Sequence, residues 1–149
     1  MQTDVDGGPI RPAAWRLTAG PTDAAVPRIR HAVRDLVVRH RAPLSGDLLH
    51  GALLIVSELV TNAVRHAALL TPEIGVDVVL GLRSLRLAVE DGHPYRPKAL
   101  EPVPEREQLG GRGLLLVRAI ALETGGDCGV ERTASGGKVV WATLPFDRV

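Results

Sequence analysis

The sequence predicts an α+β fold, a two-layer sandwich whose mixed, mostly antiparallel sheet carries its helices on one face. Three observations predict this fold. Apolar residues recur at helical spacing in three stretches and alternate at strand spacing in others, and the helical stretches fall between the strands. The 149 residues, 45% of them apolar, suffice for one substantial core. We therefore expect a flexible tail over residues 1–12 and a single domain over residues 13–149.

Helical spacing of apolar residues is found in three stretches, residues 22–40, 45–68 and 112–122. Residues that favour N-caps stand at the first two starts, Thr22 or Asp23 for one helix and Ser45 or Asp47 for the next. The break at 71–72, which contains a proline, ends the second and longest helix.

Strand character is found in five stretches, residues 13–17, 75–82, 85–90, 127–132 and 138–144. The second and third stretches predict a hairpin, as do the fourth and fifth, which are joined through the turn at 134–137. Residues 92–111 contain four prolines and three glycines, a density that excludes a regular helix or a central strand. A segment of this kind inside a compact domain indicates a functional lid or disorder.

Composition excludes several classes of function. The formal net charge is +1 and aromatic residues make up 3% of the chain, so neither a basic field nor a stacking platform predicts nucleic-acid binding. No signal-like leader and no uninterrupted apolar run of membrane-spanning length is present in the sequence. The single Cys128 cannot form an internal disulfide. We expect a cytoplasmic protein without direct nucleic-acid or membrane contact.

The second helix carries the residues with the clearest chemical potential. Glu58 and Asn62 are four residues apart and therefore lie one turn apart on the same side of the helix. A carboxylate can accept a proton, and an amide oxygen can ligate a hard cation such as Mg²⁺. Taken by spacing alone, the pair is equally compatible with the solvated face of an amphipathic helix.

The string over residues 54–67, Leu-Ile-Val-Ser-Glu-Leu-Val-Thr-Asn-Ala-Val-Arg-His-Ala, closely resembles the N-box of the GHKL ATPases, which have the Bergerat fold. It is most similar to the anti-sigma factor and serine-protein kinase branch, with its histidine-kinase-like ATPase domain. The resemblance implies that Glu58 acts as general base and that Asn62 ligates Mg²⁺ on the phosphates of ATP. It suggests a phosphate contact for His66, whereas Arg65 is a surface charge.

A second motif ends the strand over 85–90. Asp91 and Gly92 resemble the start of the family's G1 box, in which the Asp accepts a hydrogen bond from the adenine amino group. The family pattern is Asp-x-Gly-x-Gly, and this chain has His93 and Tyr95 in place of both glycines. That departure affects the wall of the adenine pocket. The alternative is that Asp91 is a turn residue.

Two further stretches resemble parts of the family's nucleotide site. The glycine-rich start of the third helix resembles the G2 box, whose glycines wrap the triphosphate; the candidates are Gly110, Gly111, Arg112, Gly113 and Leu114. In the last strand, Thr143 is a candidate for the adenine site. The alternatives are a plain helix start for the first stretch and a strand-favouring residue for the second.

The resemblance implies a regulatory protein that binds ATP and Mg²⁺. It would sequester a sigma factor, phosphorylate an anti-sigma-factor antagonist on Ser or Thr, or do both, and the first helix could form a homodimer or partner surface. The alternative is an ATP-binding or degenerate protein-interaction module without phosphotransfer.

Overall fold

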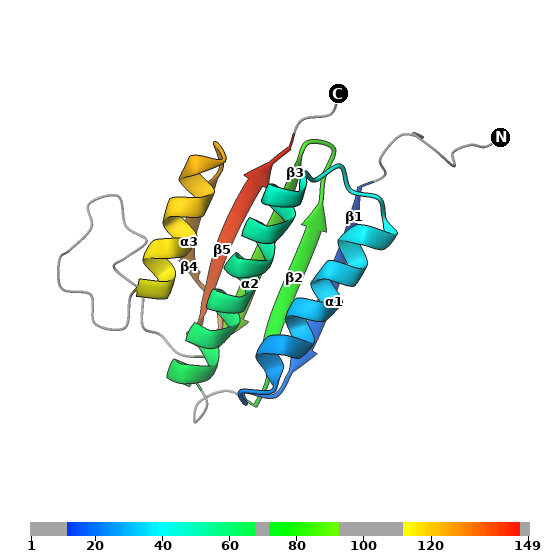
Figure 1. Ribbon diagram of the computed structural model, residues 1–149. Coiled ribbons are helices and arrows are strands. Elements are labelled where there is room, and N and C mark those ends of the chain that lie inside the picture. The colour runs from blue at the N-terminus through cyan, green and yellow to red at the C-terminus, as the bar shows by residue number, and fades with distance from the viewer. Residues whose placement is uncertain (1–11, 68–71, 93–111, 147–149) are drawn as a thin grey trace.

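The computed structural model describes residues 12–67, 72–92 and 112–146. Within these ranges, a five-stranded sheet is covered on one face by three helices, which confirms the predicted two-layer α+β sandwich (Figure 1). The elements in chain order are β1 (Ala13–Ala19), α1 (Ala25–Arg39), α2 (Gly46–Ala67), β2 (Ile74–Leu80), β3 (Ser84–Asp91), α3 (Arg112–Glu123), β4 (Asp127–Arg132) and β5 (Lys138–Pro145). The predicted tail at 1–11 and the predicted lid at 93–111 lie outside the described residues.

The sheet has the strand order β1-β2-β3-β5-β4, and each of these four pairings between described strands is antiparallel. After β3 the chain passes through α3 to the edge strand β4 and then returns as β5, which fills the place beside β3. The return turn is closed by Gly136, which has a φ of +95°, a conformation that favours glycine. The register that follows pairs Asp91 at the end of β3 with Lys138 at the beginning of β5.

The starts of the first two helices differ. Ser45 caps α2 as predicted, because its Oγ accepts a hydrogen bond from the backbone N–H of Leu48 at 3.0 Å. The cap prediction for α1 is wrong. Ala24 is the N-cap residue, and no side chain makes a capping hydrogen bond there. The chain enters α1 through a turn in which the N–H of Ala25 bonds to the carbonyl of Thr22.

The core lies between the helical layer and the sheet. Each helix presents an apolar stripe to the strands, and alternate residues of the strands point back at it. The α2 helix is central, with α1 on one side of it and α3 on the other (Figure 1). By length and composition Gly46–His66 would be apolar enough to cross a membrane, with a mean hydropathy of 1.3. Packing on the sheet accounts for that apolar content.

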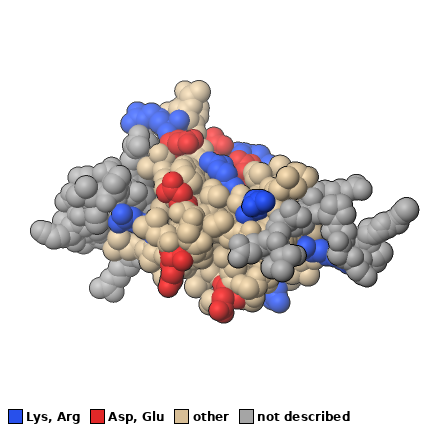
Figure 2. All heavy atoms as spheres, turned by 90° about the horizontal axis from the view of Figure 1, so that it is seen from above, with Lys and Arg blue, Asp and Glu red and all other residues tan. Residues whose placement is uncertain are grey.

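The face of the sheet that carries no helices is polar. Arg16 on β1 donates hydrogen bonds to Asp77 on β2 at 3.0 Å and to Glu90 on β3 at 2.8 Å. These bonds, that to Glu90 first, raise the pKa of the Arg16 guanidinium above its ordinary value. On the end of the molecule seen in Figure 2, acidic and basic side chains are interspersed among uncharged residues, as expected from the net charge of +1.

Candidate functional site

Elements far apart in the sequence meet at one end of the sheet, the lower end in Figure 1. The C-terminal half of α2 and the end of β3 point to this end, and α3 and β5 both begin there. The antiparallel pairing of β3 with β5 makes this arrangement necessary, since one strand must begin where the other ends. Most of the predicted site residues are therefore collected in one region.

Glu58 is a half-buried residue of α2 that lies against the beginning of α3. Gly113, the second residue of α3, is so close that a Cβ at position 113 would overlap Oε1 of Glu58. Glycine is the residue that leaves this space for the carboxylate. The contact joins the two predicted motifs, the polar stripe of α2 and the glycine-rich start of α3.

A cavity of about 580 Å³ opens between α1 and α2 beside Glu58. Arg30 and Arg34 of α1 line one side of it, and Ser57 and Glu58 of α2 line the other. The hydroxyl oxygen of Ser57 is buried there without a hydrogen-bond partner. Glu58 thus lies between a hollow that contains basic side chains and the N-terminus of α3.

Asn62 follows Glu58 by one helical turn and is 8% exposed. An amide buried to this degree is not part of a solvated helix face, so the alternative reading fails for Asn62. His66, one turn further, is half-buried, and Arg65 is exposed, as expected for a surface charge. Glu58, Asn62 and His66 form a line along α2.

Asp91 is buried and forms an ion pair with Lys138. The Lys138 Nζ lies 3.1 Å from each carboxylate oxygen of Asp91, and the two side chains are 0% and 2% exposed, respectively. Asp91 is therefore more than a turn residue at the strand end. Sequence reasoning missed Lys138, although its place in the alternation of β5, two residues before Val140, puts it on the buried face.

The first turn of α3 offers backbone N–H groups that no helical carbonyl can accept. Gly113 and the backbone of Arg112 belong to this turn, whereas Gly110 and Gly111 lie outside the described residues. The side chain of Leu114 is 3% exposed and belongs to the hydrophobic core. Any contact of Leu114 with a ligand is thus restricted to its backbone.

The assignment of Thr143 to this site is wrong. Thr143 pairs with Arg86 and stands five residues after Lys138 on β5, a separation of about 17 Å along the strand at the usual rise. The odd number of steps also puts Thr143 on the opposite face of the sheet from Lys138. Strand character was read correctly here, but the face and the position along the strand were not.

A family model described as the histidine kinase-like ATPase domain matches residues 19–144 of this sequence. The match runs through every helix and most strands and contains both the N-box stretch and the start of α3. The chain belongs to this family. It is an ATP-binding domain of the histidine kinase type, which confirms the GHKL resemblance.

Solved structures show the same fold in histidine kinases. The mycobacterial sensor histidine kinase MprB gives a TM-score of 0.55 at 17% identity, over 92% of this chain and 100% of that one. The catalytic domain of histidine kinase ThkA gives 0.51 at 16% identity, over 88% and 97%. The histidine kinase domain of the Erythrobacter litoralis EL346 blue-light activated kinase gives 0.51 at 22% identity, over 83% of this chain and 60% of that chain. Comparison with curated proteins gives no match.

The donor set of this ATPase domain fits a metal ion that arrives with the nucleotide. No group of three His, Cys, Asp or Glu side chains able to hold a metal ion is found within residues 12–67, 72–92 and 112–146. Mg²⁺ does not require such a cage, because it is commonly held by one or two protein oxygens together with phosphates and water. Asn62 and Glu58, adjacent on α2, offer two such oxygens. The bound metal would neutralise phosphate charge.

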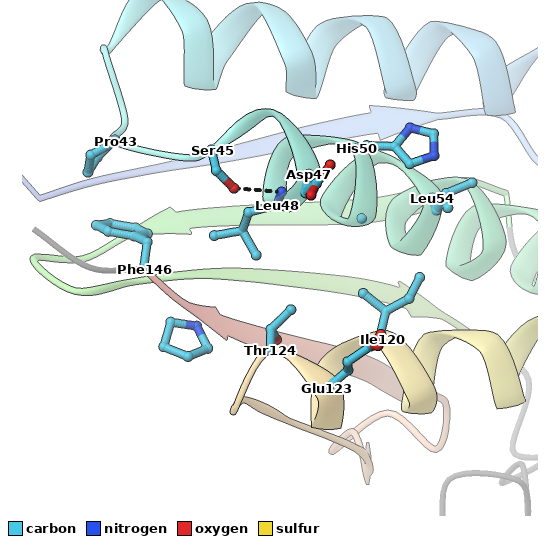
Figure 3. Close-up of a pocket in the computed structure, with 12 residues that line it drawn as sticks. Pro43, Ser45, Asp47, Leu48, His50, Leu54, Ile120, Glu123, Thr124 and Phe146 are labelled. Atoms are coloured by element: carbon cyan, nitrogen blue, oxygen red, sulfur yellow. Dashed lines mark hydrogen bonds between the residues drawn. The ribbon is translucent and has the colours of Figure 1, made fainter.

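A second cavity, of about 670 Å³, lies at the opposite end of the ATPase domain (Figure 3). It is formed by the beginning of α2, the end of α3 and the residues that close β5, with Asp47, His50 and Glu123 among its polar residues and Leu48 and Phe146 among its apolar ones. None of the predicted nucleotide-site residues lines it. This cavity is distinct from the site around Glu58.

Proposed function

We propose that this chain is a regulatory serine/threonine-protein kinase that uses ATP and Mg²⁺ to phosphorylate an anti-sigma-factor antagonist, sequesters a sigma factor, or does both. The observation that carries the proposal is the packing of Gly113 against the Glu58 carboxylate. A potential base stands beside the helix N-terminus that would hold phosphates. The resemblance of residues 54–67 to the anti-sigma branch supplies the choice of partner.

In the proposed reaction an acceptor hydroxyl oxygen forms a bond to the γ-phosphorus while the bond from that phosphorus to the β,γ-bridging oxygen breaks, and ADP leaves. Glu58 takes the hydroxyl proton. Asn62 holds the metal ion, and the first N–H groups of α3 contact the phosphate oxygens. Asp91 faces the base. Most of the rate gain comes from positioning and charge neutralisation.

The remaining features of the proposal concern the setting of the protein. We place it in the cytoplasm, where sigma factors act, and assign it no direct contact with nucleic acid or membrane. The α1 helix, with Arg30 and Arg34 beside the cavity at Glu58, is the proposed partner or homodimer surface.

Phosphate transfer tests this function. The purified chain is incubated with ATP labelled at the γ-phosphate and an extract of its source organism, and labelled proteins are analysed for phosphoserine and phosphothreonine. We expect one labelled regulator of a sigma factor. In Glu58→Gln the transfer rate should fall by about 100-fold or more while ATP binding persists. Glu123→Gln, at the other end of the domain, is the matched control and should transfer normally.

Transfer at the full rate in Glu58→Gln would remove Glu58 from its proposed role. Binding of ATP without any transfer, to any protein, would favour the second candidate function, an ATP-binding interaction module. One structural observation favours that candidate: Asp91, the proposed base contact, is already engaged in a buried ion pair with Lys138.

A further inference from the structure

Lys138 is a buried cation at the place where the proposed function puts the nucleotide base. A lysine side chain is almost never fully buried unless it is paired, and Lys138 has 0% of its side chain exposed. Its ammonium lies at the same distance, 3.1 Å, from both oxygens of Asp91. The carboxylate is thus neutralised by the protein itself.

The backbone around this ion pair is fixed by close packing. Lys138 and Asp91 are directly opposite each other in the β3–β5 pairing. At the preceding position, a Cβ on Gly137 would overlap the carbonyl oxygen of Asp91 and would lie 2.8 Å from Cα of Gly92. The turn that leads into this position is also held, because the N–H of Gly137 donates to Oγ1 of Thr133 at 2.9 Å. The ammonium is therefore delivered to Asp91 by a rigid strand start.

A pairing of this kind changes how the site can select a base. A site whose buried acceptor is satisfied only by the ligand rejects analogues without the donor, because they leave that acceptor unpaired. Here Lys138 already supplies hydrogen bonds to Asp91. A base with a keto oxygen in place of the amino group leaves no unpaired carboxylate, and the ammonium can donate to that oxygen.

We propose that Lys138 is a specificity-determining residue that relaxes base selection, so that purine nucleoside triphosphates with a 6-keto group bind nearly as well as ATP. The proposal rests on the proposed nucleotide site. Asp91 accepts from the 6-amino group of adenine, and Lys138 donates to the 6-keto group of hypoxanthine or guanine. The pair therefore accepts either purine.

Binding of ATP and of inosine triphosphate, each with Mg²⁺, tests the proposal. These two ligands are compared by calorimetry on the wild-type chain, Lys138→Thr and Lys138→Arg. The wild-type dissociation constants should agree within about tenfold, since no buried group is left unpaired by either ligand. In Lys138→Thr the preference for ATP should rise by about tenfold or more, mainly through weaker binding of inosine triphosphate. Lys138→Arg, which keeps a cation beside Asp91, should retain the wild-type ratio.

A wild-type preference for ATP of about 100-fold or more would overturn the proposal, and it needs no variant to be folded. An unchanged ratio in folded Lys138→Thr would overturn it as well. Failure of the wild-type chain to bind either nucleotide is a different result. It would overturn the proposed function, and this inference with it.

Discussion

Gly113 of α3 lies so close to Glu58 of α2 that a single added methyl group would overlap the Glu58 carboxylate. The absence of a side chain at position 113 therefore permits the carboxylate and the helix N-terminus to share one place. Substitution of this glycine is the simplest way to disturb the site while every polar side chain is retained.

Gly113→Ala should displace the Glu58 carboxylate or the start of α3. We expect phosphate transfer to fall and the free energy of unfolding to drop by about 1–3 kcal/mol, the usual cost of overpacking. Gly46→Ala is the control, because it also lies in the first turn of a helix but has no atom within 4 Å of the added Cβ. Urea unfolding and the transfer assay measure both effects. Equal behaviour of the two variants would show that the Glu58–Gly113 contact has no functional weight.

Ser45→Ala should destabilise the domain through the loss of the α2 cap. The bond from Ser45 Oγ to the N–H of Leu48 contributes about 1 kcal/mol in typical caps. Thr22→Ala removes a residue that the sequence predicts as a cap for α1 but that makes no capping hydrogen bond. Thermal unfolding should show a lower midpoint for Ser45→Ala, by about 2–4 °C, and almost no change for Thr22→Ala. The reverse order would contradict the observed cap geometry.

Lys138→Met should be strongly destabilising, because it leaves the Asp91 carboxylate buried without its cation. Removing one partner of a buried pair costs about 3–5 kcal/mol, whereas Asp91→Asn together with Lys138→Met removes both charges and should recover most of that loss. Arg39→Gln breaks the exposed pair with Asp35 and serves as the control, with a cost within about 0.5 kcal/mol. Chemical unfolding of the four proteins measures the coupling. Additive effects of the two buried substitutions would show that the pair is not coupled.

Cys128 should be a slowly reacting thiol. Burial raises the pKa of the Cys128 thiol above its ordinary value of 9.0, and the neighbouring Asp127 acts in the same direction. At pH 8 the folded protein should therefore be alkylated more slowly than the urea-unfolded chain. The folded state holds the thiol proton more tightly, so the free energy of unfolding should fall as the pH rises above about 9. Equal alkylation rates of folded and unfolded protein at pH 8 would contradict the raised pKa.

The fold was largely predictable because burial on one side imposes a period on each element. In β5 the buried residues Val140, Ala142 and Leu144 alternate with half-buried ones, and a strand over 138–144 follows from that pattern alone. The cap of α1 was not predictable in this way. Thr22 has the chemistry of a cap, but the chain makes a further turn and begins the helix after Ala24.

The candidate site divides along the same line. Glu58 and Asn62 share a side of α2 by helix geometry, whatever the rest of the fold does. The pairing of Asp91 with Lys138 depends on which strand lies beside β3 and in what register, and neither is visible in local sequence. Thr143 was misplaced for the same reason.

The claim that Glu58 and Asn62 lie in a Mg²⁺–ATP site is tested most directly by ATP titration with and without Mg²⁺. Wild type should bind ATP at least about tenfold more tightly with Mg²⁺, because Asn62 holds the ion on the phosphates. Asn62→Ala should lose this enhancement, whereas Thr61→Ala, at the adjacent position on α2 and facing the cavity beside α1, should keep it. The absence of any Mg²⁺ enhancement in wild type, or its full retention in folded Asn62→Ala, would contradict the site.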